Sequence, residues 1–239
     1  MPEAVHLLDA DPDLGEHLDA RREALARHHL IARLERVDAG GWEPKEDAFE
    51  AIGGLGLLIV EGLALRQVSL GPRAAAELLG AGDLLRPWED DGEHAAYPFS
   101  ASFRVIQPLR LAVIDRDLTV KLMHFPEVVS RLVGRVMARS RRVVGHLVIA
   151  QLTSVDTRLH VVLWHLADRF GRVRPDGVHL PLHLTHETLG LIVGARRPGV
   201  TSALGRLVER GLVDPQPKGG WLLRGDPPEA ITSLRTGRI

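Results

Sequence analysis

The sequence predicts an α+β protein with a β-rich N-terminal part, one long central helix, and a C-terminal part of short helices closed by a β hairpin. Three observations carry this prediction. Brief apolar runs bounded by Gly and Pro fill residues 30–118, an unbroken helical periodicity covers residues 126–152, and amphipathic segments separated by turn residues follow. We therefore place the domain boundaries at 1–124, 125–153 and 154–239.

The composition limits the chemistry of the chain before any motif is considered. Its 239 residues are 45% hydrophobic and 26% charged, which suits one large or two ordinary globular domains. No stretch approaches the roughly 18 apolar residues of a membrane span, and the acidic N-terminal segment is unlike a secretory signal. We expect a soluble, cytoplasmic protein with no membrane partner. Zero cysteines exclude disulfides, thiolate metal sites, Cys-ligated iron–sulfur clusters and thiol nucleophiles.

The net charge of −1 hides an asymmetry between the two halves. Residues 1–124 hold 13 Lys and Arg against 22 Asp and Glu, whereas residues 125–239 hold 17 against 9. A basic domain attracts polyanions, and nucleic acid is the commonest of them. The same imbalance also fits solvated surface charge without a function, so the motifs have to decide between the two interpretations.

The N-terminal part begins with a helical rhythm over residues 12–29, which predicts a short amphipathic helix. Between residues 30 and 118 the apolar runs are four to eight residues long and end at Gly or Pro. That texture is typical of an antiparallel β sandwich or barrel.

The long helix predicted over residues 126–152 carries two apolar stripes. Six residues are spaced 4-3-4-3-4, the a/d rhythm of a two-stranded coiled coil: Val133, Met137, Ser140, Val144, Leu147 and Gln151. A neighbouring stripe contains Val129, Leu132, Val136 and Val143. We expect one stripe to pack on the β domain and the six-residue stripe to pack on a second copy of the chain, giving a homodimer; a helix buried within its own monomer is the alternative. The arginines of this helix, Arg131, Arg135, Arg139, Arg141 and Arg142, face solvent or pair with the acidic half.

Residues 184–213, LTHETLGLIVGARRPGVTSALGRLVERGLV, have the pattern of two short helices joined by a turn. Thr185 is placed to begin the first helix, Gly194 permits the turn, and Pro198 suits the first turn of the second helix. The expected buried stripes are Leu189, Ile192 and Val193, then Val200, Leu204 and Leu207. Together with a preceding amphipathic helix at 156–170, this arrangement predicts a helix-turn-helix.

In a helix-turn-helix, the outward positions near the start of the second helix face the base edges of DNA. Here these positions hold Arg197, Pro198, Thr201 and Ser202. The guanidinium fork of Arg197 suits guanine O6 and N7, and the two hydroxyls reach bases or phosphates. Residues 212–223 then predict a β hairpin, the wing of a winged helix, with Lys218 at its tip against the DNA backbone.

The segment at 184–213 resembles the winged helix of the Crp/Fnr family of transcription regulators, and the order of parts resembles that family over nearly the whole chain. GAGDLL at residues 80–85 adds a weaker match. The resemblance implies a cyclic-nucleotide-binding-like β-roll (a double-stranded β-helix), a dimerisation helix and a winged helix-turn-helix. It also implies a homodimer that binds double-stranded DNA at a two-fold symmetric operator, a β-roll that senses a small effector or relays a signal, and RNA polymerase as a further partner.

The residues expected to contact DNA follow from the motif and from this resemblance. By position, Arg197 and Ser202 occupy sites that read bases, whereas Thr185, Arg196 and Gly199 lie near phosphates. The full expected set is Thr185, His186, Arg196, Arg197, Pro198, Gly199, Thr201, Ser202, Arg206 and Lys218. Pro198 and Ser202 replace the Glu and Arg common in cyclic-AMP-responsive members, so we expect a different operator.

The β-roll departs from the cyclic-nucleotide pattern at both of its anchors. Gly82-Asp83-Leu84-Leu85 is followed by Arg86-Pro87 where those members have Gly-Glu, and Phe99 precedes Ser100-Ala101 where they have Arg. The acids between, Glu89, Asp90, Asp91 and Glu93, would repel a cyclic phosphate. We expect no tight binding of cyclic AMP, and the effector stays unidentified. Arg86 or Arg104 either serves a different anion or forms a plain ion pair.

Twelve histidines raise the question of a metal or haem. The clusters His28-His29, His160/His165 and His179/His183/His186 lack the spacing typical of a zinc site. His94 and His124 are the candidates for a haem ligand, but ordinary surface histidines are the favoured interpretation, and Trp88 and Trp164 are expected to fill apolar gaps. We expect no metal and no cofactor.

Two other classes of protein compete with the DNA-binding regulator. A cupin-like or nucleotide-processing enzyme would need a nucleophile elbow, phosphate loop, metal triad or diagnostic carboxylate pair, and the sequence offers none. A winged helix that docks on a protein is the other alternative, and the basic balance of residues 125–239 argues against it. We therefore expect a transcription regulator and not an enzyme.

Overall fold

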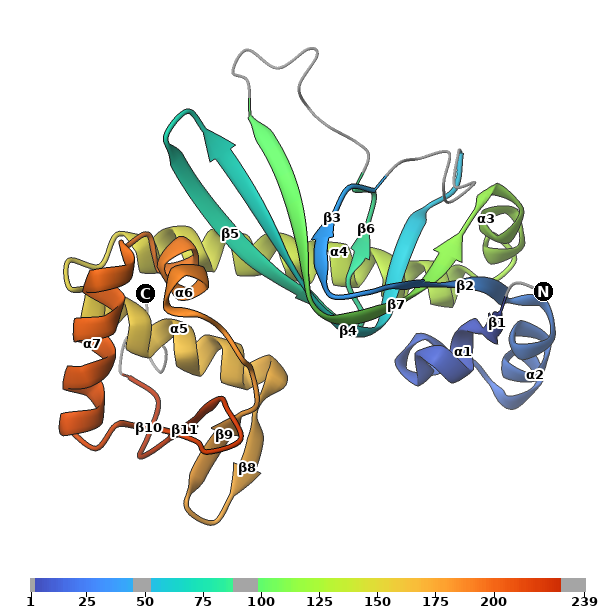
Figure 1. Cartoon of the computed structure of the whole chain (residues 1–239). Coiled ribbons are helices and arrows are strands. Elements are labelled where there is room, and N and C mark those ends of the chain that lie inside the picture. Colours follow the sequence, from blue (N-terminus) through green and yellow to red (C-terminus); the bar gives the residue numbers. More distant parts are fainter. Residues whose placement is uncertain (1–2, 45–52, 88–98, 229–239) are drawn as a thin grey trace. The chain divides into compact units, whose positions relative to one another are not determined.

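The computed structural model of the chain describes residues 3–44, 53–87 and 99–228, which form two compact units (Figure 1). The first unit holds the described residues up to Arg73 together with Glu77–Arg142, and the second holds Ala74–Ala76 and the described residues from Val143 on. Both helices and sheets are present in quantity, so the expected α+β class is confirmed. The Trp88 and His94 predictions, and the acids at 89–93, lie outside the described residues.

The first unit is built on a sheet whose described strands number seven, in the order β1-β2-β7-β4-β5, with β3 on β7 and β6 on β4. Their bounds are β1 Ala4–His6, β2 Ile31–Val37, β3 Gly40–Trp42, β4 Gly56–Leu70, β5 Arg73–Gly80, β6 Leu84–Leu85 and β7 Ser100–Ile114. The pairs β1–β2, β2–β7, β3–β7, β4–β6 and β4–β7 are antiparallel, as expected. β4 and β7 run for 15 residues each, longer than the expected runs, because a bulge at Gly62 bends β4 without ending its pairing with β7.

The side chains of β4 and β7 alternate between two cores. Leu57, Ile59 and Val113 belong to one buried cluster with Trp42 and Phe103. The intervening residues of the same strands belong to a second cluster with the N-terminal helices: Leu58, Ala112 and Ile114. Successive residues of a strand point to opposite faces, and burial of both faces explains the continuous apolar runs at residues 57–60 of β4 and 111–114 of β7.

The N-terminal segment corrects one prediction, that of a single helix over 12–29. It contains α1 (Leu7–Ala10), a 3-10 turn (Pro12–Gly15) and α2 (Ala20–His29). α2 begins where the carboxylate of Asp19 accepts a hydrogen bond from the backbone N–H of Arg22 at 2.8 Å. Leu14 lies in this 3-10 turn, and its side chain is fully buried in the second core cluster.

The long helix α4 (Pro126–Ala150) follows α3 (Arg116–Leu122) and matches the predicted span to within two residues. Val128 and Leu132 are buried in the second core cluster. Four of its five arginines form ion pairs with acids of the first unit: Arg131 with Glu16, Arg135 with Asp11, Arg139 with Glu77, and Arg142 with Asp83. The predicted pairing with the acidic half is therefore confirmed for these four.

The second unit packs three helices on a small sheet. Its described strands run in the order β10-β11-β9-β8. The bounds are α5 Val155–Phe170, β8 Arg172–Arg174, β9 Gly177–Leu180, α6 His186–Val193, α7 Arg197–Glu209, β10 Val213–Pro215 and β11 Trp221–Leu223. All six residues of the two predicted inward stripes are buried, and so is Trp164. Within the ranges given above, no helix combines the length and hydropathy needed to cross a membrane.

Candidate nucleic-acid interface

A glycine in the left-handed backbone conformation lies in the turn between α6 and α7 of the second unit. Gly194 has φ 64°, and its N–H and that of Ala195 both donate to the carbonyl of Gly190, the latter at 2.9 Å. Gly190 itself lies where a Cβ would be 2.5 Å from the Ala195 carbonyl oxygen. The turn therefore folds back on α6 closely enough that only a glycine fits at residue 190.

Arg158 of α5 holds the same turn in place through hydrogen bonds. The sequence analysis did not identify this residue. Its Nη1 donates to the carbonyls of Val193 and Gly194 at 2.9 and 3.1 Å. These carbonyls end α6, where a cation is favoured by the helix dipole. The contact joins residues 35 positions apart, and no local pattern in the sequence signals it.

The first turns of α7 carry the exposed residues that the sequence singled out. Arg196, the N-cap residue of α7, gives no side-chain hydrogen bond to the helix. Val200 and Leu204 face inward and are buried. On the opposite side Arg196, Arg197, Pro198, Thr201 and Ser202 are exposed, with Gly199 half-buried beside them. Within the described residues neither Arg196 nor Arg197 has a carboxylate partner.

The start of α6 is tied to the exposed face of α7. Thr185 caps α6, since its hydroxyl oxygen accepts from the N–H of Thr188 at 3.1 Å. His186 Nδ1 lies 2.8 Å from the hydroxyl of Thr201, which is 3.1 Å from the Arg197 carbonyl. The structure thus brings Thr185, His186 and Thr201 to one surface with the start of α7.

Arg206 and Lys218 are placed apart from that cluster. Arg206, near the end of α7, forms a two-pronged ion pair with Asp156 of α5, at 2.7 and 2.5 Å. The hydrogen bond and charge of Arg206 lower the pKa of the Asp156 carboxyl. Lys218 is exposed in the turn between β10 and β11, as the wing prediction requires, where Gly219 donates to the Gln216 carbonyl at 2.8 Å.

The six-residue stripe of α4 is exposed in the single chain. Val133, Met137, Val144 and Leu147 are 53%, 57%, 56% and 60% exposed, whereas Leu132 of the neighbouring stripe is 1% exposed. Ser140 and Gln151 are exposed too. In that neighbouring stripe, Val129 packs on the core, but Val136 and Val143 are exposed. The interpretation that buries the whole helix in its monomer is therefore wrong for the six-residue stripe.

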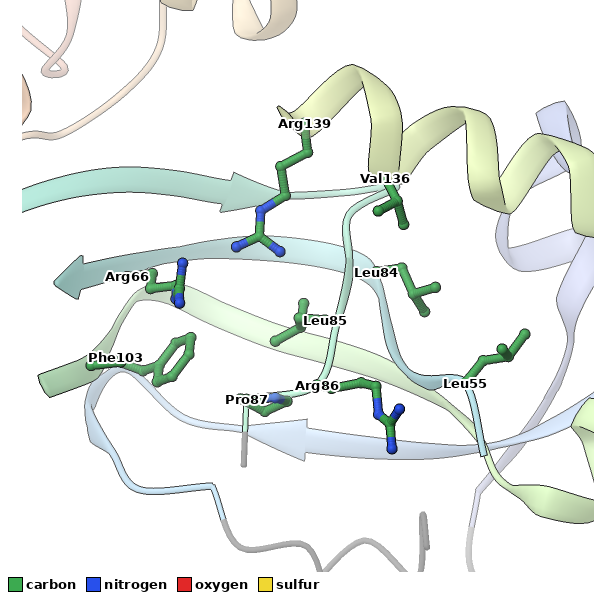
Figure 2. Close-up of a pocket in the computed structure, with 10 residues that line it drawn as sticks. Leu55, Arg66, Leu84, Leu85, Arg86, Pro87, Phe103, Val136 and Arg139 are labelled. Atoms are coloured by element: carbon green, nitrogen blue, oxygen red, sulfur yellow. The ribbon is translucent and has the colours of Figure 1, made fainter. Parts of the chain in front are cut away.

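The first unit contains a cavity of about 360 Å³ beneath α4 (Figure 2). It is lined by Leu55, Arg66, Leu84, Leu85, Arg86, Pro87, Ala101, Phe103, Val136 and Arg139. Of the two arginines left open as anion contacts, Arg86 lines this cavity; Arg104 is exposed on β7 and is not among the lining residues.

Several histidines of the described residues contact another ring. No group of three His, Asp or Glu suited to a metal ion occurs in the ranges that the structure describes. The rings of His28 and His29 pack edge to face with their centroids 4.9 Å apart. Those of His146 and His165 do the same at 5.0 Å. His160 accepts a hydrogen bond from Trp164 at 3.1 Å.

The second unit matches a known family. The family described as the Crp-like helix-turn-helix domain covers residues 157–224. A "CRP-like cAMP-activated global transcriptional regulator" of Mycobacterium tuberculosis is 28% identical over 151 residues, which cover 62% of this chain and 67% of that protein.

Solved structures are similar over most of the chain. A CooA mutant from Carboxydothermus hydrogenoformans has 17% identity and a TM-score of 0.64, with 86% of this chain and 87% of that chain covered. A cyclic nucleotide-binding domain containing protein from Listeria monocytogenes has 17% identity and a TM-score of 0.65, with 89% and 96% covered. At these identities the likeness establishes the fold, and it confirms the cyclic-nucleotide-binding-like β domain followed by a helix-turn-helix.

Proposed function

Because the chain belongs to the Crp/Fnr family of transcription regulators and has a helix-turn-helix DNA-binding domain, we propose that it acts as a homodimer on a two-fold symmetric operator in double-stranded DNA. In this proposal α7 of each copy enters the major groove, one helical turn apart. We propose three functional parts of the chain: a sensor-like part at 1–124, a dimerisation helix at 125–153 and a DNA-binding part at 154–239.

The observation that carries the proposal is the exposed start of α7. Arg196 and Arg197 lack carboxylate partners in the described chain, and no side chain caps the helix. An uncapped helix N-terminus offers free N–H groups and a positive dipole to a phosphate. An exposed arginine with unused donors beside it suits a guanine edge.

The roles of the expected residues follow from their positions. Arg197, Thr201 and Ser202 read bases, with Pro198 against the same base edges. Thr185, Arg196 and Gly199 lie near phosphates; His186 orients the hydroxyl of Thr201, and Lys218 lies along the DNA backbone from the wing. Arg206, by contrast, positions α7 on α5 through Asp156.

The exposed stripe of α4 supports the homodimer. Val133, Met137, Val144 and Leu147 lie on one face of α4 and are each more than half exposed. Exposed apolar side chains along one face are costly in water and typical of a helix that packs on a second helix. The same helix repeated by a two-fold axis would bury Val133, Met137, Val144 and Leu147 against their own copies.

We further propose that the first unit senses a small effector other than cyclic AMP, that the dimer contacts RNA polymerase, that it works in the cytoplasm, and that it catalyses no reaction. The relatives that match are regulators and not enzymes. A shift of α7 relative to its copy would then alter the match to the operator half-sites.

The experiment is a selection of bound fragments from the organism's own genome, followed by mobility shifts on the selected site at two salt concentrations. Affinity should fall steeply with salt, with a slope of about −0.9 for each phosphate contacted. A selected site without two-fold symmetry would refute the operator. Failure to enrich any DNA, with a protein partner retained instead, would favour the protein-docking alternative.

A further inference from the structure

The hydroxyl of Thr201, on the exposed side of the first turns of α7, lies between two partners. It is 3.1 Å from the carbonyl oxygen of Arg197 in the same helix and 2.8 Å from Nδ1 of His186 at the start of α6. A carbonyl oxygen only accepts, so the hydroxyl donates its proton either to that oxygen or to the imidazole nitrogen. In both arrangements the single O–H donor of Thr201 is used within the protein.

The same contacts set the direction of the Thr201 side chain. A threonine in a helix can bond back to the carbonyl of the preceding turn, which selects one of its two common rotamers. His186 adds a partner from a second helix, and its ring is half-buried directly after Thr185, the capping residue of α6. Because the oxygen is directed to α6 and to the preceding turn, the Cγ2 methyl group of Thr201 is what remains for a partner outside the protein.

Pro198 extends this apolar feature. It is exposed in the first turn of α7, three residues before Thr201. Residues three apart are neighbours on the surface of a helix, and the ring of proline has no N–H to donate. Next to the guanidinium of Arg197, the exposed start of α7 therefore presents a ring and a methyl group side by side.

One chemical group in the major groove of DNA suits such a surface. All four bases show hydrogen-bonding groups there, but only thymine adds a methyl group, at C5. Contact between apolar groups removes both from water. A cytosine amino group or a guanine oxygen at the same place would lose its water without gaining a partner.

We infer that Thr201 recognises a thymine of the operator through its methyl group, with Pro198 completing the contact, and that His186 is the positioning residue that directs the hydroxyl away from the base. The inference rests on the proposed operator binding, and it adds the base and the group that is read. It differs from the hydroxyl contact that the sequence suggested for Thr201.

The test is a series of mobility shifts of the full chain on the selected operator. Each thymine of a half-site is replaced in turn by uracil, which lacks only the C5 methyl group. One position should weaken binding about fourfold, and about 15-fold when both half-sites carry the change, since burial of one such group contributes about 0.8 kcal/mol. Operator binding without any uracil-sensitive position would overturn the inference alone, whereas failure to bind any operator would remove the proposed function with it.

Two variants of Thr201 separate its methyl group from its hydroxyl. Thr201→Val keeps a methyl group and should keep the uracil effect, whereas Thr201→Ser keeps only the hydroxyl and should reduce the effect to less than about twofold. The opposite result would show that the hydroxyl reads the base. The matched control is Thr157→Ser, which removes the same group from an exposed residue of α5 beside Asp156, the partner of Arg206 near the other end of α7. It should show the full uracil effect.

Variants of His186 test its positioning role. His186→Ala leaves the hydroxyl of Thr201 without its partner on α6, so the side chain can rotate and the uracil effect should shrink. His186→Asn provides an amide nitrogen near the place of Nδ1 and should restore the effect. A full uracil effect in His186→Ala, or no recovery in a folded His186→Asn, would overturn this role, and circular dichroism checks that both variants are folded.

Discussion

Within the described residues, the helices α4 and α7 each have one covered face and one face that is left uncovered, and the two uncovered faces differ in chemistry. On α4 the covered face pairs its arginines with acids, and the uncovered face holds Val133, Met137, Val144 and Leu147. On α7 the covered face is apolar, and the uncovered face holds Arg196, Arg197, Thr201 and Ser202.

This difference in chemistry indicates what kind of partner surface each face would bind. An apolar stripe gains most from another apolar stripe, because burial removes it from water. An arginine without a counter-ion gains most from a polyanion, because binding releases condensed counter-ions. Arginine thus pairs with acids inside the first unit, whereas on α7 it is the residue that we propose contacts DNA.

The largest expected effect comes from placing charge on the uncovered face of α4. Val144→Asp together with Leu147→Asp should give monomers, because like charges would face each other across the interface. Loss of the second half-site contact should weaken operator binding by about 100-fold or more. Light scattering and a mobility shift measure the two results.

The matched control is Val120→Asp, which places the same charge on an equally exposed valine of α3 away from the stripe. It should stay dimeric. A double variant that is still dimeric would disprove the assigned interface.

The next effect compares the two ends of α7. Arg197→Ala should cost about 1–3 kcal/mol on the selected operator and relax discrimination at one base pair. Arg206→Ala should instead leave base discrimination unchanged and lower the melting temperature slightly, since its guanidinium binds Asp156.

Binding curves on the operator and on single-base variants distinguish these outcomes. Equal loss on every sequence would make Arg197 a phosphate contact. If Arg206→Ala changed the sequence preference, Arg206 would have to be assigned as a DNA contact after all.

The smallest effect concerns a polar pair on the covered side of the second unit. Burial, and then the charge of Arg210, lower the pKa of His160, whose Nε2 accepts from Trp164. The unfolded chain therefore takes up a proton more readily, and the free energy of unfolding should fall as the pH drops below about 6.5 and level off once the folded protein is protonated too.

Urea unfolding between pH 8 and 5, followed by circular dichroism, measures this loss. His160→Gln should remove part of the pH dependence. An unchanged pH dependence in that variant would assign the effect to other groups.

The sequence predicted the helix-turn-helix well because its signals are local. The Thr185 cap, the left-handed Gly194, Pro198 in the first turn and the buried stripes all act within a few residues. The exposed stripe of α4 was equally readable, since a 4-3 spacing describes one face of one helix. Its pairing with a second chain stays a prediction.

Contacts between distant parts of the chain could not be predicted in this way. Arg206 has the same outward position as a DNA contact, and only the fold brings Asp156, 50 residues earlier, to its guanidinium. Likewise Arg66 and Arg139 share Glu77 because β4, β5 and α4 meet in space. In the N-terminal segment, the helical spacing over residues 12–29 predicted one helix. The buried Leu14 lies in a 3-10 turn instead, and the Asp19 cap begins α2 only at Ala20.

Gly190 helps to set the direction of α7, because a glycine has no Cβ methyl group. The Ala195 carbonyl occupies the space where that methyl would sit, so even alanine would push residues 194–196 outward and tilt the helix that begins at Arg197. In a symmetric pair both copies would tilt alike, and the span between the two helix tips would change by the sum of both movements. In the proposed complex, Gly190 would thereby alter which half-site spacing the protein accepts.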